Sequence, residues 1–290
     1  MLALLWERAH HYWPGTIPGR GGRCVTTAGD GERSTAALRP GVAIAGRHMA
    51  KSFGHVNALT DANVTVESGK VVALLGDNGA GKSTFLKCLL GIERPSSGTL
   101  VIADQETTLD TVRDAQRLGV DCIHQDLALA PALSVVDNMF LGHQVRHRGV
   151  RGRLGVVARR EMSERAAAAL EELSIRLPSL SVPVSDLSGG QRQAVAVARA
   201  VMWSSTAVLM DEPTAALGAR QSEIVCELMR TVAARGLGVL VVSHDLPRVL
   251  KVADRVAILW RGETVVETEA AGLSVPDVVA TMVGYRKAVA

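Results

Sequence analysis

Aromatic residues are scarce in this chain: Phe, Trp and Tyr make up only 3% of its 290 residues, while hydrophobic residues as a whole reach 47%. The apolar content therefore comes mainly from Ala, Val and Leu, a composition that suits a compact α/β protein. A chain of this length can bury a sizeable core, and it can hold one large domain or two small ones.

Cysteine and net charge are low as well. The four cysteines, Cys24, Cys88, Cys122 and Cys226, lie far apart and form no metal-ligand spacing. This usage favours a reducing, cytoplasmic setting. The formal net charge of +3 is too small to indicate nucleic acid or an anionic surface as a partner.

Long hydrophobic runs are missing too. No stretch approaches the roughly 20 apolar residues that a membrane-spanning helix needs. The apolar patch at residues 1–6 is too short for a secretory signal, because Glu7 and Arg8 interrupt it. We therefore expect that the chain does not span a bilayer, and that any role at a membrane depends on a partner.

A glycine-rich run stands out between the apolar segments 71–75 and 85–90. Its glycines let the backbone curl so that successive N–H groups point inward at nucleotide phosphates. Lys82 can reach the β- and γ-phosphates, and the Ser83 hydroxyl can hold Mg²⁺. The run matches GxxxxGK[ST] and predicts a strand, a phosphate-binding loop and a helix. Its residues are Gly76, Asp77, Asn78, Gly79, Ala80, Gly81, Lys82, Ser83 and Thr84.

Two parts of the chain differ in their pattern. Residues 1–41 are rich in glycine and arginine without a sustained period, which predicts a disordered N-terminal extension; a regulatory or docking tail is the alternative. Residues 42–285 are regular and predict one nucleotide-binding domain. Its helices concentrate between about residues 127 and 200, notably in the Ala-rich stretch 160–173.

Short apolar segments before and after this helical stretch predict the strands of a sheet. Segments 256–260 and 263–267 flank Arg261-Gly262 and predict a hairpin. Strands on both sides of a helical middle predict an α/β fold: a P-loop NTPase core with a mixed or parallel sheet and an inserted helical subdomain. The other expected strands are 42–44, 62–66, 71–75, 120–123, 208–210 and 239–242.

A second motif, Leu187-Ser188-Gly189-Gly190-Gln191, precedes the helix-like run 192–202. Ser188 is a favourable N-cap, and the two glycines leave the start of the helix open to an approaching anion. By itself, this segment also fits an ordinary capped helix. With this motif and the phosphate loop in one chain, residues 42–285 resemble the ATP-binding cassette (ABC) ATPases, in which the second motif is the signature segment.

The resemblance extends to further elements in the family's order. Phe53 lies where the family carries an aromatic residue that stacks on adenine. Gln125 matches the Q-loop glutamine, which links Mg²⁺ and the attacking water to the transporter partner. Residues 207–212 match the Walker B strand, and His244 matches the switch histidine. The resemblance implies an ATPase that binds ATP and Mg²⁺. The implied nucleotide contacts outside the phosphate loop are Phe53, Ser188, Gly189, Gly190 and Gln191.

The residue types at these positions also suit that chemistry. Asp211 ends an apolar strand, at the place where a carboxylate binds Mg²⁺ or its waters. Glu212 can polarise a water for in-line attack, and His244 can donate to a γ-phosphate oxygen. Taken singly, each of the three also fits a strand-end polar residue. With both motifs present, we expect Glu212, His244 and Gln125 to be catalytic, and Ser83, Gln125 and Asp211 to hold the metal.

The resemblance also implies partners. In the family, the signature segment caps the γ-phosphate of ATP on the opposite subunit, so a head-to-tail dimer with an identical chain or a close relative is implied. Residues 215–218 read Ala-Ala-Leu-Gly where the common pattern is Ser-Ala-Leu-Asp, and this is similar to the simple-sugar importers. That branch implies a monosaccharide importer at the cytoplasmic face of the membrane, with permease subunits near residues 127–142 and a secreted or periplasmic solute-binding protein.

Two other functions stay open. One is a soluble ABC-type ATPase that acts on nucleic acid or ribosomes, and the other is an exporter ATPase. Relatives of the first kind usually carry two cassettes or a long coiled coil, and exporters more often have fused membrane helices. This chain shows none of these features. The basic segment 146–160 predicts a solvated loop, with contact to lipid headgroups as the alternative.

Overall fold

The computed structural model describes residues 41–147, 149, 153–215 and 217–284. The chain separates into two units, residues 1–38 and residues 39–290, and all of the described residues belong to the second unit. The predicted extension at residues 1–41, apart from Gly41, therefore lies outside the described residues, as does Ala216.

The described residues form one mixed sheet. Its strands are β1 (Val42–Phe53), β2 (Val56–Glu67), β3 (Val71–Gly76), β4 (Ser97–Ile102), β5 (Gln105–Thr107), β6 (Val120–Ile123), β7 (Ala207–Asp211), β8 (Gly238–Val242), β9 (Arg255–Trp260) and β10 (Glu263–Glu269). Their order is β5-β4-β1-β2-β10-β9-β3-β8-β7-β6. The strands from β9 to β6 pair in parallel, whereas β1, β2, β4 and β5 form antiparallel pairs.

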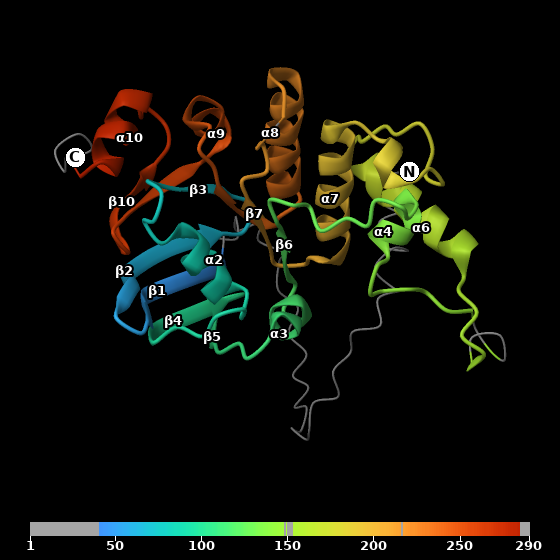
Figure 1. The fold of residues 1–290 in the computed structure, drawn as a ribbon, viewed down its shortest axis with the longest axis horizontal. Coiled ribbons are helices and arrows are strands. Elements are labelled where there is room, and N and C mark those ends of the chain that lie inside the picture. The colour runs from blue at the N-terminus through green and yellow to red at the C-terminus, as the bar shows by residue number, and fades with distance from the viewer. Residues whose placement is uncertain (1–40, 148, 150–152, 216, 285–290) are drawn as a thin grey trace, which may run out of the picture. The chain divides into compact units, whose positions relative to one another are not determined.

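Helices alternate with the strands along the chain. They are α2 (Lys82–Leu89), α3 (Val112–Arg117), α4 (Val135–Met139), α6 (Arg159–Glu172), α7 (Gly189–Trp203), α8 (Ala219–Ala234), α9 (Leu246–Val252) and α10 (Val275–Met282), with a short 3-10 helix at Val184–Asp186. Helices α4, α6 and α7 contact one another and gather at one end of the sheet, away from β1, β2, β4 and β5 (Figure 1). Within the described chain, none of the helices combines the length and apolar character needed to cross a bilayer.

Strand β3 leads into the site, and both of its faces are covered. Every residue of Val71–Gly76 is buried. Val72 and Leu74 belong to the apolar cluster that includes Phe85 of α2, whereas Ala73 and Leu75 belong to the cluster formed with α7 and α8. A strand that is covered on both faces needs a continuous apolar run rather than an alternating one, which explains the apolar segment 71–75.

Several sequence predictions of secondary structure are confirmed. The strand at 120–123 has the expected bounds, and the predicted hairpin forms from β9 and β10. Arg261 and Gly262 have φ values of 50° and 84°, as a two-residue type I′ turn requires. Strands β1 and β2 are longer than expected, at 12 residues each. Polar residues such as Arg47 and Lys51 interrupt the apolar pattern, but the antiparallel pairing continues through them.

Candidate active site

The phosphate loop connects β3 to α2, and its backbone bends sharply before the helix. Gly81, the residue before α2, has a φ of 107°, a value that residues with a Cβ rarely adopt. A Cβ at this position would lie 2.6 Å from the backbone oxygen of Ala58, because β2 passes close to the loop. The turn therefore needs glycine both for its backbone angle and for space.

Lys82 begins α2 and is held beside the loop. Its Nζ donates to Gly76 O at 2.7 Å and to Asp77 O at 2.9 Å, and the residue is only 7% exposed. Burial lowers the pKa of Lys82, whereas the carboxylates of Glu212, Asp77 and Asp211 act to raise it. The ammonium group thus has backbone oxygens as hydrogen-bond partners and three acidic residues as charged neighbours.

Several backbone N–H groups of the loop are open to a ligand. No acceptor among the described residues takes a hydrogen bond from the amides of Gly79, Gly81, Lys82 and Ser83. Unpartnered amides at the start of a helix favour anionic ligand oxygens. The donor set therefore fits the phosphates of a nucleotide.

The acidic pair Asp211-Glu212 and His244 meet at the ends of neighbouring strands. Asp211 of β7 pairs with Val242 of β8, and Glu212 N donates to Val242 O at 2.9 Å. The Glu212 carboxylate reaches His244: Oε2 accepts from the His244 backbone N at 3.2 Å, and Oε1 lies 3.0 Å from Nε2 of the ring. Parallel pairing places both carboxyl ends at one edge of the sheet, and so brings Glu212 and His244 into contact.

Glu212 has an unusual backbone and an unsatisfied side-chain atom. Its φ is 51°, in the left-handed region that non-glycine residues rarely adopt and that recurs at functional sites. Oε1 is buried and accepts no hydrogen bond, because the His244 ring approaches it without hydrogen-bond geometry. A buried oxygen without a donor is costly. A donor from a bound water or ligand, or a turn of the His244 ring, would satisfy this atom.

Burial raises the pKa of both acidic residues. For Glu212, the nearby His244 and Lys82 charges oppose this shift, and Asp211 adds to it. For Asp211, the His124 and Lys82 charges oppose it. Two half-buried carboxylates on adjacent residues are stabilised by any further positive charge, so the pair favours a bound cation at this end of β7.

The oxygen ligands that Asp211 and Ser83 offer are of the kind that Mg²⁺ prefers. The Asp211 carboxylate and the exposed Ser83 hydroxyl are hard ligands, and Mg²⁺ usually takes only one or two carboxylates together with substrate phosphates. Gln125 is exposed in the turn after β6, directly after His124, whose charge acts on Asp211. The residues expected to hold the metal therefore fit that ion chemically.

Phe53 lies at the exposed end of β1, where 44% of the residue is accessible. It pairs with Val56 across the turn to β2, and β2 then reaches Gly81 through Ala58. The hairpin that carries the aromatic ring is therefore also the one that approaches the phosphate loop.

The signature segment forms the start of α7. Ser188 N donates to Gln191 Oε1 at 2.9 Å, and Gln191 N donates to Ser188 Oγ at 3.3 Å. This reciprocal pair is a capping box, and it confirms Ser188 as the N-cap. Gly189 and Gly190 occupy the first turn, so the N-terminus of α7 carries no bulky side chain there.

Sequence reasoning missed two residues beside these groups. Lys51 Nζ lies 4.8 Å from the centroid of the Phe53 ring, and it is held by Glu93 Oε2 at 3.0 Å and by Arg94 O at 2.8 Å. Lys51 lies two residues before Phe53 on β1, and residues two apart on a strand share a face. This spacing could have indicated from the sequence that Lys51 lies beside the Phe53 ring. His124 carried no signal, because its effect on Asp211 arises only when β6 and β7 pair.

The family follows from a comparison of the sequence with known families. A family model described as ABC transporter matches residues 59–215, more than half of the chain. The matched segment includes the phosphate loop, the signature segment and the pair Asp211-Glu212. This chain belongs to the ABC transporter family.

Curated relatives of this cassette carry names of sugar importers. It is 41% identical over 239 residues to the xylose/arabinose import ATP-binding protein XylG of Sulfolobus acidocaldarius, covering 82% of the cassette chain and 93% of the relative. It is 39% identical over 243 residues to the fructose import ATP-binding protein FrcA of Rhizobium meliloti, with coverages of 83% and 94%. The ribose import ATP-binding protein RbsA 1 of Rhizobium meliloti is 37% identical, but the cassette chain spans only 48% of its length.

Solved structures share the fold. An ATP-binding cassette of an ABC transporter in its ADP conformation has a TM-score of 0.71 at 24% identity, covering 84% of this chain and 99% of that one. A dimeric ATP-binding cassette in a post-hydrolysis state, bound to ADP and phosphate, has a TM-score of 0.65 at 26% identity, covering 79% and 100%. The predicted α/β P-loop NTPase fold and the predicted family are thus confirmed.

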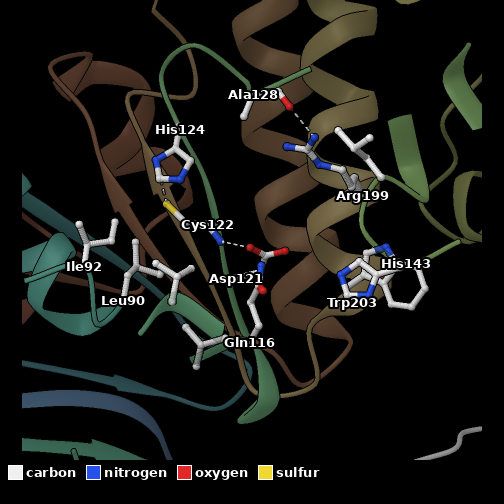
Figure 2. Close-up of a pocket in the computed structure, with 13 residues that line it drawn as sticks. Leu90, Ile92, Gln116, Asp121, Cys122, His124, Ala128, His143, Arg199 and Trp203 are labelled. Carbon is white, nitrogen blue, oxygen red and sulfur yellow. Dashed lines mark hydrogen bonds between the residues drawn. The ribbon is translucent and has the colours of Figure 1, made fainter. Parts of the chain in front are cut away.

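The cassette also has a groove beside the Gln125 turn (Figure 2). Arg199 of α7 donates to the backbone oxygens of Leu127 and Ala128 at 2.9 and 2.7 Å, and so ties the turn to α7. One turn further along α7, the His143 ring stacks on Trp203 with 4.1 Å between the ring centroids. Exposed apolar residues along the groove are Ile92, Val112 and Leu141.

Proposed function

We propose that this cassette hydrolyses ATP to power the import of a monosaccharide, as a peripheral subunit at the cytoplasmic face of a membrane. The observation that carries the ATPase is the contact of Glu212 with His244 beside the phosphate loop, with one Glu212 oxygen left without a donor. The sugar assignment is supported by relatives named for xylose/arabinose and fructose import, whose length the cassette covers almost completely.

Different residues bind the phosphates, accept the proton of the attacking water and donate to the γ-phosphate. The open amides of the loop and the Lys82 ammonium bind the β- and γ-phosphates. Glu212 accepts a proton from the attacking water through Oε1, and its buried position favours that step because burial raises its pKa. His244 donates to a γ-phosphate oxygen. Ser83, Asp211 and Gln125 would hold Mg²⁺, and the ion would neutralise charge on the phosphates.

A second cassette completes the site. We infer a head-to-tail dimer, in which the signature residues Ser188, Gly189, Gly190 and Gln191 of one chain cap the γ-phosphate held by the other chain. The first turn of α7 supports this arrangement, because the amides of Gly189 and Gly190 donate to no acceptor among the described residues, while Leu217 and Gln221 pack against only one side of the two glycines. A dimeric cassette structure of the same fold also supports it.

The groove beside the Gln125 turn is the proposed docking place for the permease. Its exposed apolar residues, Ile92, Val112 and Leu141, suit the apolar face of a short helix. Because Arg199 ties the turn to α7, a helix seated there contacts both the Q-loop and the signature helix. A secreted or periplasmic solute-binding protein would deliver the sugar to that permease.

Uptake measurements test the import proposal against the alternative, an ABC-type ATPase acting on nucleic acid or ribosomes. A strain that lacks the gene is expected to lose uptake of one labelled monosaccharide. The wild-type gene should restore that uptake, whereas the gene carrying Glu212→Gln should not. Unchanged uptake of every monosaccharide tested, together with co-sedimentation of the cassette with ribosomes, would overturn the import proposal.

The Phe53 ring gives a test of adenine recognition. Phe53→Ala is expected to weaken ATP binding by about tenfold, because stacking on a base contributes about 1–3 kcal/mol. Phe53→Trp should bind ATP within about twofold of wild type, since it keeps a stacking face. Isothermal titration with ATP and with tripolyphosphate measures both effects.

Tripolyphosphate separates stacking from damage to the loop. It lacks the base, so its affinity should not change in Phe53→Ala. Val56→Ala removes another exposed apolar side chain of the same hairpin and serves as the matched control. Equal losses for ATP and tripolyphosphate would show that Phe53 does not contact adenine.

A further inference from the structure

Lys51 is held in place by the loop that follows α2. Its Nζ lies 3.0 Å from Glu93 Oε2 and donates to Arg94 O at 2.8 Å, and the side chain is only 14% exposed. The same loop is tied to β1 next to Lys51, because Ser96 N donates to Ala50 O at 2.8 Å. The ammonium group of Lys51 therefore has a defined position beside β1.

Helix α2 connects this position to the phosphate loop. The helix begins at Lys82, and Lys87 lies in its last turn. The backbone N–H groups of Ile92 and Glu93 both donate to Lys87 O, at 3.0 and 3.2 Å. Glu93 is thus fixed to the end of the helix whose first residue lies in the phosphate loop, and it sets the position of Lys51 relative to that loop.

The Phe53 ring has one face occupied, and the end of its hairpin is open. Lys51 Nζ lies over the ring, 4.8 Å from its centroid, within the distance at which a cation is attracted to an aromatic face. Phe53 is nevertheless 44% exposed, and Val56 is 66% exposed. A Cβ on Gly54 would meet no atom within 4 Å beyond its chain neighbours. A flat ligand that stacks on this ring must therefore take the face that Lys51 does not cover.

We propose that Lys51 is a positioning residue for the base of the nucleotide: its ammonium group holds one face of the Phe53 ring, and adenine stacks on the other. This inference rests on the proposed stacking of Phe53 on adenine. The contact orients the ring before the nucleotide binds, so less rotamer freedom is lost on binding. The base also covers the exposed face and excludes water, and the attraction between cation and ring grows as the pair is desolvated.

This attraction sets an expected size for the effect. A cation over a ring contributes more at a desolvated site than at an exposed one, and the difference corresponds to about fivefold in an equilibrium constant. Lys51→Met removes the cation but keeps a long unbranched side chain, and it should weaken ATP binding by about that factor. Its affinity for tripolyphosphate should stay within about twofold of wild type, because the phosphate loop is untouched. Lys51→Arg should bind ATP within about twofold of wild type, since a guanidinium also stacks on an aromatic face.

The experiment is isothermal titration of the full chain with ATP and with tripolyphosphate. It compares wild type, Lys51→Met, Phe53→Ala and the double variant. The double variant should bind ATP within about twofold of Phe53→Ala alone, because Lys51 acts through the ring and the two losses are not additive. Lys70→Met is the matched control. It removes another lysine that pairs with a carboxylate, Asp254 at 3.4 Å, and it should bind both ligands as wild type does.

The outcomes separate this inference from the proposed function. If Phe53→Ala weakens ATP and tripolyphosphate binding equally, the stacking on adenine is itself wrong. If Phe53→Ala weakens only ATP binding and Lys51→Met weakens neither, the stacking stands and the role of Lys51 is wrong.

Two further results would overturn the role of Lys51. Equal losses for both ligands in Lys51→Met would mean that its charge attracts the phosphates directly. A full fivefold loss on adding Lys51→Met to Phe53→Ala would mean that Lys51 contacts the base itself. A merely structural role would lower the melting temperature of Lys51→Met without a loss that is confined to ATP and restored by Lys51→Arg.

Discussion

Glu212→Gln is expected to lower kcat for ATP hydrolysis by about 10²- to 10⁴-fold, the usual contribution of a positioned general base. ATP affinity should stay within about threefold of wild type, because the phosphate loop and Lys82 are untouched. The amide has the shape of the carboxylate but cannot take the proton of the attacking water. The variant should therefore accumulate as an ATP-bound dimer, and phosphate release together with nucleotide binding measures both effects.

The pH dependence of the wild-type rate adds a second test of the same group. The base must be deprotonated, and burial raises the pKa of Glu212. As the pH is lowered, activity should therefore be lost before the pH reaches the ordinary glutamate pKa of about 4.3. The residual activity of Glu212→Gln should lack this acid limb. A variant that turns over ATP at the wild-type rate, or that keeps the same limb, would contradict the assignment of Glu212 as the base.

A matched control comes from a second acid at the surface. Glu223 is exposed on α8, and Glu223→Gln makes the same chemical change away from the phosphate loop. Its kcat should equal that of wild type. If both substitutions lowered kcat alike, the loss would reflect a general effect of charge rather than the chemistry of Glu212.

Much of the fold could be predicted because its central strands are locally unambiguous. Segment 71–75 is continuously apolar and lies between turn residues, and it forms β3, covered on both faces. The Arg261-Gly262 turn likewise determines its own hairpin. Strands β4 and β5 were not predicted, because β4 mixes apolar and polar residues and β5, at three residues, is too short to show a period. Their structure depends on pairing with β1 and with each other.

The contacts in the site likewise divide into those that the local sequence predicts and those that it does not. Lys82 and Ser188 form hydrogen bonds with partners a few residues away, so their spacing in the sequence predicts these contacts. The contact of Glu212 with His244 depends on the pairing of β7 with β8, across 32 positions of sequence. The packing of Gln221 on Gly190 likewise joins residues of different helices. Such contacts are set by tertiary structure, and no local pattern in the sequence marks them.

Lys82→Ala is expected to weaken ATP binding by at least about 100-fold. Two charge-assisted hydrogen bonds to phosphate oxygens contribute about 1.5–3 kcal/mol each, and the neutral methyl group supplies neither. The residue is 7% exposed, so water cannot easily take the place of the ammonium. Hydrolysis should fall below detection at ATP concentrations that saturate the wild-type protein. Fluorescence titration with a labelled ATP analogue measures the affinity directly.

Two further variants show whether the loss comes from the ammonium at this position. Lys251→Ala removes an exposed lysine of α9 and should bind ATP as wild type does, which controls for net charge. Lys82→Arg keeps the charge, but a planar guanidinium cannot easily donate to both Gly76 O and Asp77 O in a space that fits a compact ammonium. It should therefore recover only part of the lost affinity. Unchanged ATP binding in Lys82→Ala would show that the phosphate loop does not bind the nucleotide. Full recovery in Lys82→Arg would mean that charge alone, and not the geometry of the loop, binds the phosphates.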